Sequence, residues 1–380
     1  MMVKRRTVLW GLLGGAILGC RPRNFSPLRV KLLTRSVPSQ VLKAFSRETP
    51  SQFDAEPTLT DIYQQLQWWQ SQTSPQPPLW RRLFSLGQGD AAQENPVQGS
   101  PVTVNTHLVT LSDPWLEQAI RQQLIQPLPD FAPAERLPEP WQRLLRRDQQ
   151  GQPTARGDLW GVPYRTQGLM MAYQKPMFKN KTVIKWADLW RPELQGRIAM
   201  LDHPRLVTAV VLKALEYSVN DESVLTEEKV QEQLASLYRQ VRVFDSEAYL
   251  KALVNEDVWL AVGWSGDILA TLVRYRRLGA AYPQEGSVLT SDLWVSPVNA
   301  DLPPSVQAWM EFCWQPPIAT QISVSSYGLS PLFFLPGAKV PEKLSQDLYQ
   351  MPDNSEVLLP LSESGQNTLT DLFNAEVFRE

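Results

Sequence analysis

The stretch from Trp259 to Pro297 constrains the fold more than any other part of the 380-residue chain. An apolar run from Val258 to Val262 has the length of a buried strand, and a helix with an apolar face follows it. A second strand, Ser287 to Val295, comes after a Pro-Gln-Glu-Gly turn. Small ligands of open α/β sheets bind at the carboxyl ends of strands. We therefore expect the indole of Trp264 and the carboxylate of Asp292 to lie close together.

Strands alternate with helices along the rest of the chain. Residues 28–34 read as a first strand and residues 38–48 as an amphipathic helix, and similar pairs recur to the C-terminus. This alternation predicts an α/β fold with largely parallel sheets. We expect two lobes with a hinge and a ligand cleft between them, and chain crossings near residues 165–167 and 292–294.

Composition excludes several classes of function. A formal net charge of -2 argues against a nucleic-acid-binding protein, which would present a basic surface. Two His and two Cys leave no classical zinc cluster, so we expect no metal and no cofactor. The chain has neither a nucleophile elbow nor a phosphate loop, and the expectation is that it is not an enzyme. A glycan-active protein with paired carboxylates stays open among 39 acidic residues.

The N-terminus has the pattern of an export signal. Three basic residues, 4–6, precede an apolar run that is too short to span a bilayer comfortably. Ile17-Leu18-Gly19-Cys20 reads as a lipobox, which predicts a signal peptide at residues 1–19, lipidation of Cys20 and a tether at residues 20–27. An ordinary signal sequence is the alternative, and Sec and twin-arginine export both stay open. Cys313 would then be a buried thiol without a disulfide partner.

Two polar stretches interrupt the alternation. Residues 70–102 are rich in Gln, Pro, Ser and Gly, and we expect a surface loop inserted into the first lobe. Residues 128–156 read as a connection. Within it, Arg143, Arg146 and Arg147 are expected on one solvated helix face.

Three segments resemble the spermidine/putrescine-binding proteins of ABC importers. The segment from Trp186 to Gly196 repeats that family's Trp-Ala-Asp-Leu-Trp-x-Pro-Glu-x-x-Gly element, in which a helix packs on a strand. Trp264-Ser265-Gly266 and Pro283-Gln284-Glu285-Gly286 match its cleft segment, and Trp160 to Tyr164 resembles its crossover into the second lobe.

The resemblance implies the two-lobe periplasmic-binding-protein fold of type II. Lobe 1 would comprise residues 28–165 and 293–330, and lobe 2 residues 166–292 and 331–380. It also implies a periplasmic monomer, anchored to a membrane by lipid at Cys20. The partners would be a polyamine-like or other small polar solute and an ABC permease in the inner membrane.

Eight residues are candidates for ligand contact on the basis of this resemblance and of the strand ends. They are Trp264, Asp292, Ser112, Thr34, Asp245, Ser246, His203 and Tyr327. For Asp292 the alternative to ligand contact is a hydrogen-bonding role at the hinge. For Trp264 the alternative is packing in the core.

The chain departs from the family at several contacts. The family's Asp-x-x-Glu, which holds an amine, falls on His203 and Leu206, and Thr290 replaces an aromatic residue. The ligand therefore stays open between a polyamine and another solute. A non-transporting receptor or scaffold that kept the fold but lost the ligand is the alternative function.

Overall fold

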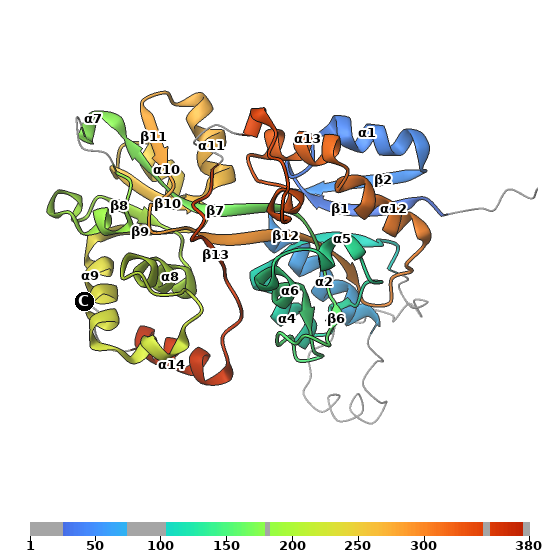
Figure 1. Cartoon of the computed structure of the whole chain (residues 1–380), viewed down its shortest axis with the longest axis horizontal. Coiled ribbons are helices and arrows are strands. Elements are labelled where there is room, and N and C mark those ends of the chain that lie inside the picture. Colours follow the sequence, from blue (N-terminus) through green and yellow to red (C-terminus); the bar gives the residue numbers. More distant parts are fainter. Residues whose placement is uncertain (1–25, 74–103, 179–182, 345–349, 375–380) are drawn as a thin grey trace, which may run out of the picture.

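The computed structural model describes residues 26–73, 104–178, 183–344 and 350–374. These residues form two lobes joined by a pair of long strands (Figure 1), and each lobe has its own hydrophobic core. The first core is built mainly from residues before Arg165 and from the segment after Val288. The second is built mainly from residues 169–288.

The first lobe is a mixed parallel and antiparallel sheet with helices on both faces (Figure 1), so the largely parallel sheet expected from the sequence is wrong there. Its N-terminal elements are β1 (Leu28–Leu33), α1 (Ser39–Glu48), β2 (Ser51–Glu56), α2 (Leu59–Thr73), β3 (Leu108–Ser112), η1 (Asp113–Trp115), α4 (Leu116–Arg121), β4 (Ile125–Gln126), α5 (Ala132–Glu135), α6 (Glu139–Leu145), β5 (Arg146–Arg147) and β6 (Asp158–Leu159). Its later elements are α12 (Pro304–Cys313), α13 (Pro316–Ser326) and η5 (Pro331–Phe334).

The second lobe also has helices on both faces of its sheet. In Figure 1, α10 and α11 lie above the strands and α8 and α9 lie below them. The elements are α7 (Lys175–Phe178), η2 (Trp186–Trp190), η3 (Pro192–Leu194), β8 (Ile198–Met200), α8 (Pro204–Ala214), η4 (Glu222–Thr226), α9 (Glu228–Gln240), β9 (Val241–Phe244), α10 (Tyr249–Val254), β10 (Leu260–Trp264), α11 (Ser265–Arg274) and β11 (Leu278–Ala281).

Two long strands, β7 (Val162–Gln174) and β12 (Val288–Pro297), run through both lobes and pair antiparallel to each other. They join the strands of both lobes into one path, β2-β1-β3-β12-β7-β10-β8-β9. All ten residues of β12 are buried. Both strands carry buried polar residues where they cross, namely Arg165 to Gln167 in β7 and Thr290 to Asp292 in β12.

The register of these strands brings the carboxyl ends of both sheets toward each other. In the first lobe, β3 runs antiparallel to β12 and ends at Ser112, opposite Asp292. In the second lobe, β10 runs antiparallel to β7 and ends at Trp264, opposite Leu169. The strands β8 and β9 run parallel to β10. Strand ends from both lobes therefore meet at the hinge, where open α/β folds bind ligands.

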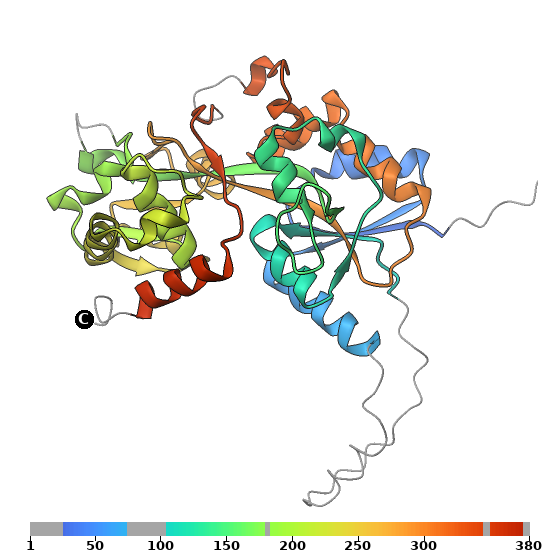
Figure 2. The ribbon, with the colours of Figure 1, turned by 60° about the horizontal axis from the view of Figure 1, so that its bottom comes forward.

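The C-terminal segment returns from the first lobe to the second. It contains η6 (Glu342–Leu344), β13 (Glu356–Val357), which pairs with β12, and α14 (Glu363–Asn374). Figure 2 shows α14 lying along the second lobe, where it packs against α8. We call residues 350–374 the C-terminal strap.

Local structure differs from expectation at two places. The helix expected in the segment from Trp186 to Gly196 consists of two short 3-10 helices, η2 and η3. The Asp188 carboxylate accepts the backbone N–H groups of Ile184 and Lys185, which fixes the start of η2. The indole of Trp186 is fully buried and donates to the carbonyl of Gly286 at 2.8 Å, so its structural role in the core is confirmed.

The expectation that Arg147 lies on a solvated helix face is wrong. Arg147 belongs to β5 and is 1% exposed. Its guanidinium donates to the carbonyls of Leu144 and Gly151 at 2.8 and 3.1 Å. The apolar side chains of the stretch 128–156 pack into the first core. The loop expected at residues 70–102 begins inside α2, which extends to Thr73, and the part from residue 74 onward lies outside the described residues.

Candidate functional site

The junction of β10 and α11 is tied directly to the crossing strand β7. The backbone N–H of Gly266 donates to the side-chain oxygen of Gln167 at 3.1 Å. The hydroxyl of Ser265 accepts the N–H of Gly168 at 3.3 Å. A Cβ atom on Gly266 would lie 2.2 Å from the Gln167 oxygen, so a larger residue would displace this side chain and break the hydrogen bond. The half-buried indole of Trp264 is thereby held where the two lobes join.

Asp267 adds a carboxylate beside this indole. It lies in the first turn of α11, its side chain is open to solvent, and the hydroxyl of Tyr249 donates to it at 3.3 Å. Sequence analysis had treated Asp267 only as a helix-starting residue. Its position just after a strand end was the signal that could have identified it.

Asp292 is neutralised within the chain. Its Oδ2 atom accepts from Nε and Nη2 of Arg165 at 2.7 and 2.5 Å, and the two residues are opposite each other in β12 and β7. Both side chains are buried, at 2% and 8% exposure. This arrangement supports the hinge role of Asp292, because its charge already has a partner. No local signal identified Arg165, which is 127 residues away in the sequence.

Ser112 belongs to a buried hydrogen-bond network under the hinge. Its hydroxyl is 3.1 Å from that of Thr290, which donates to Asp113. The backbone N–H of Ser291 also donates to Asp113, at 2.9 Å. Burial is the largest influence on the Asp113 carboxyl and raises its pKa to about 7. The hydrogen bonds from Thr290 and Ser291 and the charge of Arg147 act in the opposite direction, and the nearby charge of Asp292 adds a smaller rise.

Three further candidates lie at the carboxyl ends of β8 and β9. The Asp245 carboxylate accepts the N–H groups of Ala248 and Glu247, in that order of importance, which lowers its pKa. The Ser246 hydroxyl accepts the N–H of Asp202 at 3.1 Å, and His203 stands exposed before the first turn of α8. In this structure the side chains of Asp245 and Ser246 therefore stabilise the turns after β9 and β8 by accepting backbone hydrogen bonds.

The last two candidates come from the first lobe. The Thr34 hydroxyl is exposed and donates to the carbonyl of Glu56 at 2.8 Å, at the carboxyl ends of β1 and β2. Tyr327 follows α13 in the left-handed conformation, with φ of 55°, and its half-buried ring packs against the core of the second lobe. Tyr327 is thus a contact between the lobes.

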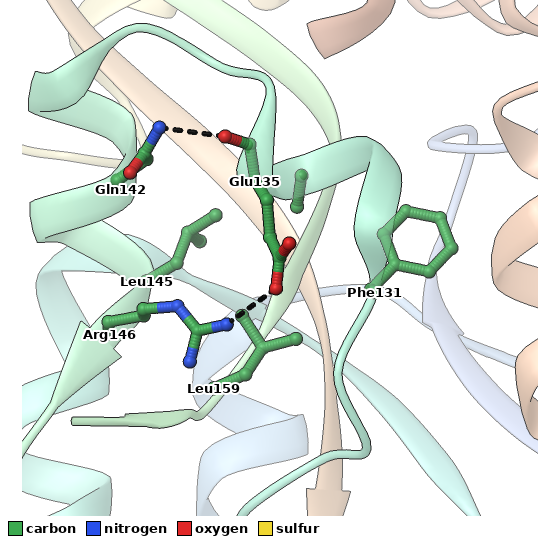
Figure 3. Close-up of a pocket in the computed structure, with 7 residues that line it drawn as sticks. Phe131, Glu135, Gln142, Leu145, Arg146 and Leu159 are labelled. Carbon is green, nitrogen blue, oxygen red and sulfur yellow. Dashed lines mark hydrogen bonds and ion pairs between the residues drawn. The ribbon is translucent and has the colours of Figure 1, made fainter. Parts of the chain in front are cut away.

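A pocket in the first lobe does not have the size of a solute site. Figure 3 shows it between α5 and α6, where Arg146 donates to the Glu135 carboxylate at 3.0 Å and Gln142 donates to the Glu135 carbonyl at 2.8 Å. Its volume is about 10 Å³, room for roughly one water molecule. Within the described ranges, no group of three His, Cys, Asp or Glu side chains is placed to hold a metal ion. None of the helices in those ranges is long and apolar enough to cross a membrane.

The two lobes, their shared hinge strands and the facing strand ends define the class of two-lobe periplasmic binding proteins. The chain belongs to the family of bacterial extracellular solute-binding proteins, whose model matches residues 88–347. This is a family of binding proteins and not of enzymes. The predicted fold class and the predicted family are both confirmed.

Individual relatives agree with this placement. The spermidine/putrescine-binding periplasmic protein of Salmonella typhimurium is 26% identical over 164 residues, which are 43% of this chain and 47% of the relative. The putrescine-binding periplasmic protein PotF of Escherichia coli is 24% identical over 239 residues, 57% of this chain and 62% of the relative. The matched region thus spans about half the length of the first of these relatives.

Solved structures share the fold over nearly the whole chain. The spermidine/putrescine ABC transporter substrate-binding protein PotD from Streptococcus pneumoniae has a TM-score of 0.69 at 19% identity, covering 94% of this chain and 100% of that chain. The Tp0655 (TpPotD) lipoprotein of Treponema pallidum has a TM-score of 0.62 at 17% identity, covering 93% and 100%.

Proposed function

We propose that this chain is the extracytoplasmic solute-binding component of an ABC importer. It binds a small polar solute, a polyamine or a related amine, between its lobes and delivers it to a permease in the inner membrane. The observation that carries the proposal is the meeting of strand ends from both lobes around Trp264 and Asp267, beside two hinge strands. Family membership and the names of the relatives support the same role.

The contacts that we assign to an amine are the indole of Trp264 and the carboxylate of Asp267. A cation over an aromatic face gains about 0.5–2 kcal/mol, and a charge-assisted hydrogen bond gains about 1.5–3 kcal/mol. Ser112, Thr34, Asp245, Ser246, His203 and Tyr327 remain proposed surroundings of the solute. Asp292 would act through Arg165, since its charge is already paired.

The proposed lobes are residues 28–165 with 293–330 and residues 166–292 with 331–380. The two hydrophobic cores support this division over most of the chain. Leu332, Phe334 and Leu335, together with Val357 and Leu359, pack in the first core and so depart from the proposed lobe 2. Before residue 28 we propose a signal peptide at residues 1–19 and a lipid anchor at Cys20, both outside the described residues. We propose that the mature protein is a periplasmic monomer that is anchored to a membrane by this lipid. Equal fatty-acid labelling of wild type and Cys20→Ala would exclude the anchor.

Calorimetric titration with spermidine and putrescine tests the proposed site. Trp264→Ala and Asp267→Asn should each weaken binding by about tenfold or more, because each removes one contact to the ammonium group. The matched controls are Trp68→Ala, an indole exposed on α2, and Asp257→Asn, an exposed carboxylate before β10. Equal affinity in wild type and both site variants would contradict the assignment.

A further inference from the structure

Arg205 carries a buried charge for which the fold supplies no hydrogen-bonding partner at two of its nitrogens. It lies in the first turn of α8 and is 8% exposed. Its Nε and Nη2 atoms are buried and have no hydrogen-bond partner among the residues that the structure describes. The hydroxyl of Thr208, one turn along the same helix, is buried and unpartnered in the same way. Buried polar groups are rarely left unpaired, since the loss of water is costly.

The two free nitrogens lie on one edge of the guanidinium. Nε–H and the adjacent N–H of Nη2 point in parallel and form the fork that fits the two oxygens of a carboxylate or phosphate. Arg165 uses the same pair of nitrogens on the carboxylate of Asp292. Arg165 and Arg205 are thus both buried, one with its fork occupied and the other with its fork empty among the described residues.

Neighbouring carboxylates do not fill this fork. Glu222 is the carboxylate with an electrostatic effect on Arg205, but its oxygens accept the N–H and the hydroxyl of Ser362 at 2.7 and 2.5 Å. Burial lowers the pKa of Arg205 to about 10, so the guanidinium keeps its charge at neutral pH. The site has a positive charge without an ion pair in the described part of the chain.

The helix itself adds to the positive potential. α8 begins at Pro204, directly after the carboxyl end of β8, and its eleven residues have no acidic side chain in the first turn. His203 precedes it without a side-chain cap. The partial positive charge of a helix N-terminus favours an anion, and Arg205 is the second residue of this helix.

We propose that the first turn of α8, with Arg205 and Thr208, binds an oxyanion group of the solute, either a carboxylate or a phosphate. This rests on the proposed function and narrows its substrate class. Trp264 and His203 follow neighbouring parallel strands, β10 and β8, so the amine contacts and the oxyanion contacts share one edge of the second lobe. The solute then carries both an amine and an oxyanion, unlike putrescine.

Thermal melting of the full chain tests the inference with three probes: putrescine, ornithine, which adds a carboxylate to the same carbon chain, and inorganic phosphate. Each is compared with sodium chloride at equal ionic strength. Ornithine or phosphate at saturation should raise the Tm of the wild type by several degrees. Arg205→Met should bind that probe at least tenfold more weakly than the wild type does. Arg205→Lys keeps the charge without the fork, and its affinity should lie between those of the wild type and Arg205→Met. Arg121→Gln, an exposed arginine of the first lobe, should behave as wild type.

The outcomes separate this inference from the proposed function. A Tm shift with ornithine alone assigns a carboxylate, and a shift with phosphate alone assigns a phosphate. A shift with putrescine alone, equal in Arg205→Met, overturns the oxyanion while keeping the importer role. No shift with ornithine or phosphate also overturns it, and mass spectrometry of solute released from the purified protein then tests the importer role separately.

The ligand-free protein provides a second measurement. Arg205→Met should raise the Tm without ligand, because it removes a buried charge that has no partner. A lowered Tm would mean that Arg205 is paired within the chain, and would overturn the inference.

Discussion

At the residue scale, the buried carboxyl group of Asp113 has an environment that opposes its charge. Its Oδ2 atom has no hydrogen-bond partner in the described part of the chain, while Oδ1 accepts from Thr290 and Ser291. Burial therefore outweighs the stabilising effect of Arg147 and of these donors, and Asp292 adds repulsion. The carboxyl of Asp113 is thus held in a buried position that disfavours its charged form.

This environment predicts a pH dependence of stability. The folded-state pKa of about 7 lies above the ordinary value of 3.8, so the folded protein binds the proton more tightly than the unfolded chain does. The contribution of Asp113 is therefore fully present below about pH 4 and is lost as pH rises through about 7, by up to about 4 kcal/mol. Asp113→Asn should flatten this part of the pH profile in urea unfolding. The same slope in both proteins would contradict the prediction.

At the scale of elements, the pairing of β7 with β12 depends on one buried ion pair. Asp292→Asn would leave the guanidinium of Arg165 charged and without a full partner, and we expect a loss of about 3–5 kcal/mol in the free energy of unfolding. The double variant Arg165→Met, Asp292→Asn should recover part of this loss. Glu139→Gln breaks the exposed pair with Arg143 and should cost at most about 1 kcal/mol.

Denaturant unfolding of the wild type and the three variants measures these differences. An effect of Asp292→Asn no larger than that of Glu139→Gln would show that the hinge does not depend on the pair. This prediction also affects binding experiments, since a weaker affinity of Asp292→Asn would follow from a disturbed hinge without any contact to solute. Asp267→Asn, whose side chain is open to solvent, is the cleaner variant for the site.

At the scale of the whole molecule, the C-terminal strap connects the lobes a third time. Lys213 donates to the Asn354 carbonyl and the Glu356 carboxylate at 2.9 and 3.0 Å. Asn220 exchanges hydrogen bonds with Val357 and Leu359, both at 2.9 Å. Val357 belongs to the first core and its neighbour Leu358 to the second. The strap thus links α8, through Lys213, to the hinge strand β12, with which β13 pairs.

Removing the strap should destabilise the second lobe. A chain ending at residue 349 loses the apolar contacts of Leu358 and Leu369 and leaves Lys213 buried without its carboxylate, a cost of several kcal/mol. Differential scanning calorimetry should show a lower Tm than for wild type, whereas a chain ending at residue 374 should melt as wild type does. Equal Tm values for the chain ending at 349 and the wild type would contradict the prediction.

The sequence by itself determined the local elements and the family. Alternation of apolar runs with amphipathic stretches depends on neighbouring residues, so β1, α1, β10 and α11 were predictable from short windows. The Trp186 to Gly196 element and the Trp264-Ser265-Gly266 strand end were recognisable for the same reason, and both led to the correct family. The position of Trp264 at a strand end followed from this local pattern.

Only the tertiary structure decided which charges are paired. Asp292 meets an arginine 127 residues away, Arg147 is buried where an exposed helix face was expected, and the fork of Arg205 is left empty. Each outcome depends on which distant segments the sheet brings together and on how much water they exclude. The energy of a charge is set by that three-dimensional surrounding, which no short window of sequence contains.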